Sequence, residues 1–209
     1  MEYYLMARRL LKNILPAIAA LTIIAPAAGA YEAGDWILRV GAGTVDPKSN
    51  NGLVASVDSG TSLVFNGTYM LNSNLGLEVL AALPFSHDIK LAAGGVKVGE
   101  TKHLPPTFSL QYHFTNDSAF TPYAGAGLNY TIFFDEKTTG PLAGSKLDLD
   151  ASFGVAAQLG FDYDISDKML VNFDLRWIDI ATDAKLDGAA LETVEIEPLV
   201  YSLTLGWKF

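Results

Sequence analysis

Residues 199–209 read LVYSLTLGWKF, and every second side chain in this stretch, from Leu199 to Phe209, is large and apolar. The residues between them are mostly small or polar. A period of two is typical of a β-strand with one apolar face. Aromatic residues lie near both ends, at Tyr201 and at Trp207 and Phe209, as they do where a strand crosses the two interfaces of a bilayer. The stretch therefore predicts a membrane-crossing strand at the end of the chain.

Seven other segments alternate in the same way. With the terminal stretch, they lie at residues 36–43, 62–71, 75–83, 108–114, 123–132, 152–163, 171–177 and 199–209. The connections near residues 72, 116 and 166 are short, and those near 46–60, 84–104, 135–150 and 180–195 are long. This regular pattern predicts an all-β fold, an eight-stranded antiparallel transmembrane β-barrel with short periplasmic turns and long extracellular loops. A β-sandwich also alternates polarity, but it buries its apolar faces and rarely keeps such regular connections.

The first thirty residues have a different character. Arg8, Arg9 and Lys12 form a positive region, an apolar stretch follows from residue 14 to 25, and Ala28-Gly29-Ala30 fits a small-residue cleavage site. An uncleaved membrane anchor is the alternative, but the apolar stretch is short for a membrane span. We expect a signal peptide at residues 1–30 and an outer-membrane barrel at residues 31–209.

The predicted mature chain is acidic and lacks cysteine. Removing residues 1–30 takes one acid and three bases from totals of 23 and 14, which leaves 22 acidic and 11 basic residues and a formal charge of −11. Nucleic acid is not expected as a partner, because phosphate binding needs a basic face. A chain without cysteine has no disulfide framework. A closed barrel does not need one, because its backbone groups pair around the ring.

The side chains opposite the apolar faces predict a mixed lumen. An eight-stranded barrel has an interior that side chains fill, or that holds one small ligand, so a wide pore is excluded. Acids and bases are expected to form a polar plug of mutual ion pairs: Arg39, Glu78, Asp174 and Arg176, in a network with Asp162, Gln111 and His113. Apolar residues are also expected to point inward, where they favour a hydrophobic passage: Val64, Leu80, Ala82 and Val200.

No catalytic or metal-binding set stands out from the sequence. Ser86, His87 and Asp88 are consecutive, and consecutive residues of an extended chain point apart, so they do not predict a triad. His87 and His103 flank one connection, but two histidines without a third ligand are a weak metal signal. We expect no enzymatic activity, no cofactor and no metal site.

Several motifs resemble the outer-membrane protein W (OmpW) family, including its AlkL- and OprG-like barrels. They are EAGD (32–35), TYM (68–70), GLEVLAALPF (76–85), HLPPT (103–107), PYAGAGLNYT (122–131), FFD (133–135) and GWKF (206–209). The resemblance covers essentially the whole mature chain, in order. It implies an eight-stranded outer-membrane barrel with a narrow hydrophobic passage that is entered from outside and releases small apolar solutes sideways through the wall.

The resemblance also implies roles for individual residues. In the family, a Leu and a Trp narrow the floor of the passage; these positions match Leu80 and Arg176, and Arg176 is a departure. The Leu-Pro-Pro element that the family links to a lateral opening is present as Leu104, Pro105 and Pro106. Proline lacks an N–H group and cannot complete a sheet ladder, which gives such an opening a physical basis.

The sequence thus predicts a passive outer-membrane channel for small hydrophobic molecules, located in a Gram-negative outer membrane. The alternative is a structural or interaction barrel that stabilises the envelope or binds partners through its loops. AlkL-type relatives promote alkane uptake, which favours the first interpretation. The expected partners are small hydrophobic solutes, outer-membrane lipids and the barrel assembly machinery, and the expected oligomeric state is a monomer.

Overall fold

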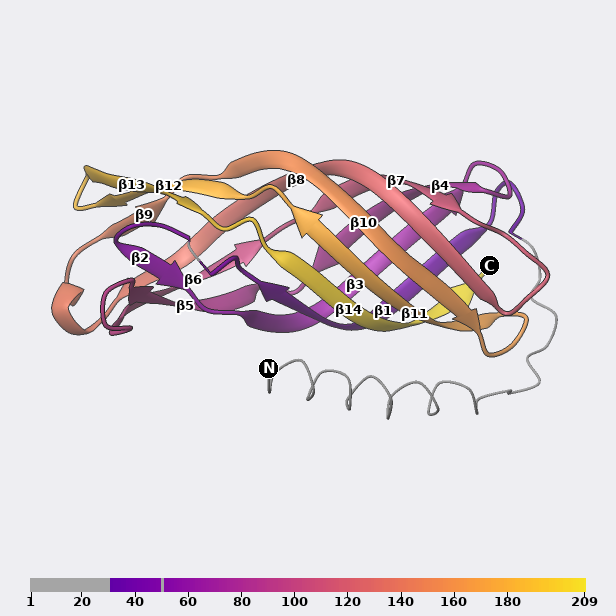
Figure 1. Ribbon diagram of the computed structural model, residues 1–209, viewed down its shortest axis with the longest axis horizontal. Coiled ribbons are helices and arrows are strands. Elements are labelled where there is room, and N and C mark those ends of the chain that lie inside the picture. The colour runs from indigo at the N-terminus through magenta and orange to yellow at the C-terminus, as the bar shows by residue number, and fades with distance from the viewer. Residues whose placement is uncertain (1–30, 50) are drawn as a thin grey trace, which may run out of the picture.

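The alternating segments close into a barrel in the computed structural model of the chain, which describes residues 31–49 and 51–209 (Figure 1). The predicted signal peptide lies outside these residues. Within the described part of the chain, no helix combines the length and the apolar composition needed to cross a membrane.

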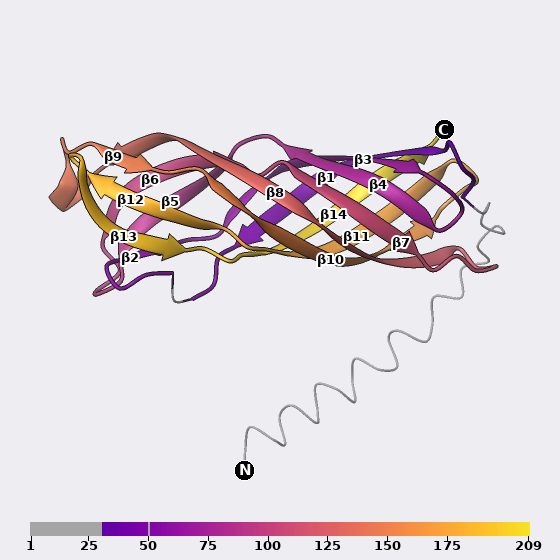
Figure 2. The ribbon, with the colours of Figure 1, turned by 90° about the horizontal axis from the view of Figure 1, so that it is seen from above.

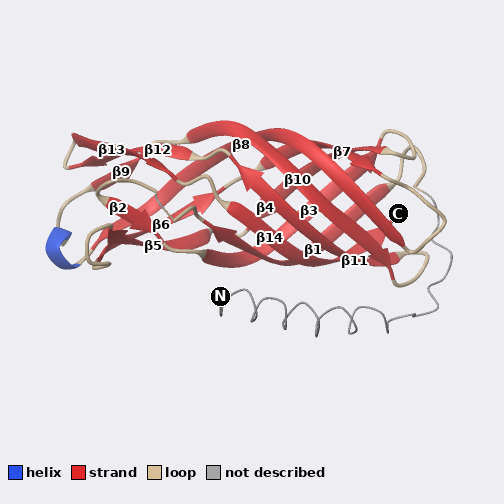
Figure 3. Ribbon diagram, in the orientation of Figure 1, coloured by secondary structure: helices blue, strands red, loops and turns tan. Residues whose placement is uncertain are grey.

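The described residues form fourteen strands and one short 3-10 helix (Figure 3). Their bounds are β1 (Trp36–Asp46), β2 (Ala55–Val57), β3 (Gly60–Met70), β4 (Leu75–Ala82), β5 (Phe85–Leu91), β6 (Lys97–Leu104), β7 (Thr107–His113), β8 (Phe120–Thr138), η1 (Gly140–Leu142), β9 (Leu147–Leu149), β10 (Ser152–Asp164), β11 (Met169–Ile178), β12 (Ala181–Leu186), β13 (Ala189–Glu195) and β14 (Leu199–Lys208).

Eight of these strands form a closed ring in the order β1, β3, β4, β7, β8, β10, β11 and β14. Neighbours pair antiparallel, and β14 returns to β1 along a ladder that runs from Ile37 opposite Lys208 to Asp46 opposite Leu199. The predicted eight-stranded antiparallel barrel is confirmed. Closure removes the sheet edges that an open sheet would expose.

The outer face of the ring is apolar. Phe108, Leu159 and Leu203 expose 61, 63 and 61% of their surfaces, and apolar neighbours surround the whole barrel. Scattered exposed apolar residues are ordinary, but a continuous band marks a surface that contacts something other than water. Paired aromatic rings, such as Trp36 and Tyr69 at 5.1 Å between centroids, lie near the end that carries the short turns. This band is the membrane-facing belt.

Two of the four long connections, residues 84–104 and 180–195, consist mostly of strands, which the sequence analysis did not predict. Residues 84–104 contain β5 and β6, which pair with each other, and residues 180–195 contain β12 and β13. Figures 1 and 2 show these strands extending the barrel at the end opposite the C-terminus. Their polarity is reversed relative to the belt: Phe85, His87 and Ile89 are buried inside, whereas Ser86 is exposed. An apolar interior surrounded by a polar outer face is expected for a part that projects into water.

Candidate functional site

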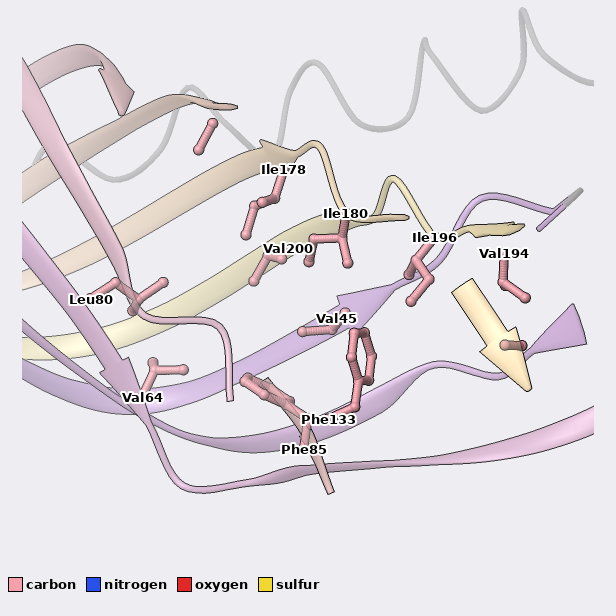
Figure 4. Packing of buried hydrophobic residues seen from close by; sticks show 12 residues of the cluster. Val45, Val64, Leu80, Phe85, Phe133, Ile178, Ile180, Val194, Ile196 and Val200 are labelled. Carbon is pink, nitrogen blue, oxygen red and sulfur yellow. The ribbon is translucent and has the colours of Figure 1, made fainter. Parts of the chain in front are cut away.

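An apolar column fills the outer half of the lumen. Its buried members are Val45, Val64, Leu80, Phe85, Phe133, Ala156, Ile178, Ile180, Ala184, Val194, Ile196 and Val200. Figure 4 shows their side chains reaching toward one another from different strands, with Leu80 and Val64 at one end and Val194 at the other. Of the four residues predicted for a hydrophobic passage, Val64, Leu80 and Val200 belong to the column and Ala82 packs against it. The structure therefore brings these four residues together, and their part in transport stays a prediction.

A polar plug fills the lumen below the column. We use this name for Arg39, Glu78, Asp162, Asp174 and Arg176, all of which are buried. Arg39 donates to both carboxylate oxygens of Asp162, from Nη2 at 2.7 Å and from Nε at 3.1 Å. Such bidentate pairs are the strongest ion pairs that side chains form. The four residues predicted for the plug are therefore inside the lumen and paired.

Arg176 connects the plug to the column. Its Nη2 donates to Glu78 Oε1 at 2.6 Å, and its Nε lies 3.4 Å from Asp174 Oδ1. In the ladder between β11 and β14, Arg176 lies opposite Val200, a member of the column. On β4, Leu80 follows Glu78 on the same inner face. The apolar column thus ends directly on an ion-paired layer.

The barrel wall is interrupted beside the column. Pairing between β4 and β7 stops at Leu80 opposite Thr107, and it resumes between β5 and β6 at Phe85 opposite His103. We call the interval between these two pairs the seam; it comprises residues 81–84 on one side and 104–106 on the other. The three residues predicted for a lateral opening, Leu104, Pro105 and Pro106, all lie in this interval, and their part in an opening stays a prediction.

Backbone direction shows which prolines matter at the seam. In an antiparallel ladder, the N–H and C=O groups of a residue face the same neighbouring strand. The Pro106 carbonyl accepts a hydrogen bond from the Tyr130 N–H at 3.1 Å, so Pro106 faces β8. The next residue, Pro105, belongs by alternation to the seam side, but it lies between β6 and β7 and follows no regular ladder. Its nitrogen has no hydrogen to donate, and its carbonyl accepts from Thr107 Oγ1 and Asn129 Nδ2, so neither group pairs across the seam.

A comparable break elsewhere in the wall is bridged. Pro198 lies between β13 and β14, opposite the junction of β11 and β12. Two backbone hydrogen bonds bridge this break: the Ile178 N–H donates to the Pro198 carbonyl at 3.2 Å, and the Ile196 N–H donates to the Ile180 carbonyl at 2.8 Å. Proline alone therefore does not leave a gap. The seam differs because it has a proline on both sides, Pro84 and Pro105.

An outer cavity of about 70 Å3 lies at the extracellular end of the column. Its wall includes Val57, Ile89, Val98, Leu149, Thr182 and Ile196, together with His87 and His103. The loop before β2 borders its mouth, where Glu192 accepts hydrogen bonds from the backbone N–H groups of Leu53 and Ala55 at 2.8 and 3.0 Å. The cavity lies among the outer strands, beyond the apolar belt.

The two cavity histidines form a stack. Their ring centroids are 4.8 Å apart with 18° between the planes, and His103 also stacks on Phe85 at 5.4 Å. Burial lowers the pKa of His87. Burial, and then the neighbouring His87, lower the pKa of His103 to about 3. Both rings are therefore neutral at pH 7.

The structure separates the residues that the sequence placed side by side near His87. Ser86 points outward and His87 inward, and the His87 Nδ1 bonds to the backbone carbonyl of Asp58 at 2.6 Å rather than to Asp88. Among the described residues, no group of three histidine, cysteine or acidic side chains is arranged to hold a metal ion.

Two residues belong to the site although the sequence analysis did not assign them to it. Tyr31 donates from its hydroxyl to Asp162 Oδ2 at 2.7 Å and is buried. It precedes the first alternating segment, so no pattern marked it. Pro84 borders the seam. It lies inside a quoted motif, and a proline between two alternating segments is the signal that could have identified it.

Comparison with known proteins gives consistent results. The OmpW family model matches residues 32–209. The outer membrane protein W of Vibrio cholerae is 42% identical over 95% of this chain and 100% of its own length. The crystal structure of the outer membrane protein OprG from Pseudomonas aeruginosa is similar at a TM-score of 0.77 and 36% identity, covering 86% of this chain and 98% of OprG. The solid-state NMR structure of AlkL in lipid bilayers is similar at a TM-score of 0.64 and 26% identity, covering 88% of this chain and 94% of AlkL.

Proposed function

This chain belongs to the OmpW family and is an outer-membrane β-barrel, and from this premise we propose that it is a passive channel for small hydrophobic molecules. Solutes enter the outer cavity, move down the apolar column to Leu80 and leave sideways through the seam into the membrane. No enzymatic step is part of the proposal.

One observation carries this proposal: the apolar column ends on an ion-paired plug. An apolar solute in the column meets Arg176 and Glu78, whose charges are already paired and buried. Passing through this layer requires separating buried charges, and breaking a buried ion pair costs about 3–5 kcal/mol. The column is therefore suited to receive apolar molecules and the plug to stop them. A route to the periplasm along the barrel axis is disfavoured.

The seam supports lateral release. It borders Leu80 and Ala82 at the lower part of the column, and its outer side faces the membrane belt, where Leu83 is exposed. A solute that leaves here moves from the apolar column directly into the apolar interior of the membrane. It does not have to cross the polar layer or water.

The experiment is solute entry into cells. We would compare the initial uptake of naphthalene with that of glycerol, a small polar control, in cells that contain or lack the chain. The proposal expects faster naphthalene uptake with the chain and unchanged glycerol uptake. Equal naphthalene uptake in both strains would contradict it.

A structural or interaction role is the second candidate, and one observation favours it. The outer end of the barrel presents Leu53, which is 94% exposed, next to exposed Val54 and Leu191. Apolar side chains at the tip of an extracellular extension are suited to contact a partner. This role predicts that Leu53→Ser changes surface binding of the cells and leaves naphthalene uptake unchanged.

A further inference from the structure

We propose that the outer cavity prefers small apolar molecules that carry one hydrogen-bond donor, such as a phenol, and that the stacked pair His87–His103 accepts this hydrogen bond. The inference rests on the proposed function, because it names the class of solute that the channel takes. It is carried by two buried ring nitrogens without partners, by the fixed tautomer of one of them, and by the apolar walls around both.

The tautomer of His87 follows from its contact with Asp58. The ring Nδ1 lies 2.6 Å from the backbone carbonyl oxygen of Asp58. A carbonyl oxygen only accepts hydrogen bonds, so Nδ1 carries the proton. Because the ring is neutral, Nε2 has no proton and presents a lone pair. His87 Nε2 is therefore an acceptor only.

Neither histidine Nε2 has a hydrogen-bond partner in the protein. Both atoms are buried, and the two residues are each 3% exposed. A buried polar atom that lacks a partner is destabilising, so such atoms indicate a place for an incoming group. Gly60 keeps space beside one of them, because a Cβ at this position would lie 3.1 Å from His87 Nε2.

The stacked arrangement disfavours a metal ion. The lone pairs of imidazole lie in the ring planes, and the planes here are almost parallel, 18° apart. Their lone pairs therefore do not converge on one point, as a chelated ion would require. A neutral donor that reaches either nitrogen in its ring plane fits this geometry.

The rest of the cavity defines the remainder of the solute. Its walls are mainly aliphatic, and one water molecule needs about 10–15 Å3, so a cavity of about 70 Å3 holds only a few groups of that size. A hydrocarbon fills this space but leaves the nitrogens unpaired. An anionic solute loses its hydration without a counter-charge, and a cation meets only Glu192, whose carboxylate already accepts backbone hydrogen bonds at the mouth. A small ring or chain with one hydroxyl meets both requirements.

The experiment compares phenol with toluene, which has a methyl group in place of the hydroxyl. The mature chain in lipid nanodiscs is dialysed against each radiolabelled compound, and binding to empty nanodiscs is subtracted. Replacing His87 by phenylalanine should weaken phenol binding about fivefold, as expected for loss of one hydrogen bond, and leave toluene binding unchanged. His103→Phe should act in the same direction, and His103→Gln, which keeps an acceptor, should retain the phenol affinity.

Phe133→Leu is the matched control, because Phe133 lines the same cavity and contacts His103 without offering an acceptor. This substitution should weaken the binding of phenol and of toluene equally. If both histidine variants changed phenol and toluene alike, the hydrogen-bond inference would be overturned while the hydrophobic channel stood. If the parent bound neither compound, both the inference and the proposed function would be contradicted. If His87→Phe does not fold, the two His103 variants decide.

Discussion

Closing the seam should reduce transport without weakening the barrel. The change is the double substitution Pro84→Ala and Pro105→Ala, which returns one N–H group to each side of the unpaired interval. The restored donors can then complete the ladder between the third and fourth barrel strands. Alanine also allows the extended backbone that this pairing needs.

The size of the effect follows from the number of bonds. A hydrogen bond contributes about 0.5–1.5 kcal/mol net, so two bonds favour the closed seam by about 1–3 kcal/mol. Since about 1.4 kcal/mol is a tenfold change in a population, the open fraction should fall roughly five- to 150-fold. Loss of two prolines makes the unfolded chain more flexible, by about 0.4–1 kcal/mol each. These terms nearly cancel, so the melting temperature should change little.

The assay is initial naphthalene uptake at matched outer-membrane levels of each variant. Pro106→Ala is the control, because Pro106 faces β8 and its restored N–H leaves the seam as it was. We expect uptake to fall at least fivefold in the double variant and to stay at the parent value in the control. Undiminished uptake by a correctly folded double variant would refute lateral release through this seam.

Three further outcomes follow from the same geometry. Leu80→Asn places an unpaired amide in the column, which costs about 1–3 kcal/mol in a protein interior. Naphthalene uptake should therefore fall about fivefold or more, whereas Leu80→Ile should keep it. Glu78→Ala leaves Arg176 buried with one partner fewer, so urea unfolding should show a loss of about 3–5 kcal/mol, and Glu78→Leu combined with Arg176→Met should recover much of it. Burial holds the pKa of His103 below its ordinary value, so as the pH falls the unfolded form takes up the proton before the folded form does. The contribution of His103 to folding stability is therefore complete above about pH 6.5 and is lost as the pH falls toward 3. Amide protection in β5 and β6, corrected for intrinsic rates, should therefore drop between pH 7 and pH 5, and less so in His103→Phe.

Alternation alone was enough to predict the barrel and the direction of its side chains. In β4, for example, Glu78 and Leu80 point inward and Leu77 outward, as the period of two requires. The same rule placed Arg39 and Arg176 in the lumen. The side of the sheet to which a side chain points depends only on its position along the strand, and so a local sequence pattern reveals it.

The outer strands were missed because their polarity is reversed. Residues 85–91, with the sequence FSHDIKL, alternate as well as the belt does, but the apolar side chains point inward. We assigned residues 84–104, and with them Ser86, His87 and Asp88, to a long extracellular loop because we expected apolar faces to contact lipid. Above the membrane, the outer face contacts water, so the polar side chains point outward and the apolar ones inward.

Contacts between segments that are far apart in the sequence could not be predicted from it either. The partner of Arg39 is Asp162, and the partner of Arg176 is Glu78 as well as Asp174. Alternation places these groups in one lumen but not at one height, because height depends on the stagger between strands. The stacking of His87 on His103 depends on the same stagger.

The route of the solute is the central claim, and methyl NMR tests it most directly. The mature chain, labelled at its Ile, Leu and Val methyl groups in lipid nanodiscs, is titrated with naphthalene. We predict shifts at column residues from Val194 down to Leu80, and at Leu83 beside the seam, with none at Leu170, which lies in the separate apolar cluster with Tyr31. Shifts at Leu170 comparable to those at Leu80, or no shifts along the column, would contradict a route that enters from outside and leaves above the plug.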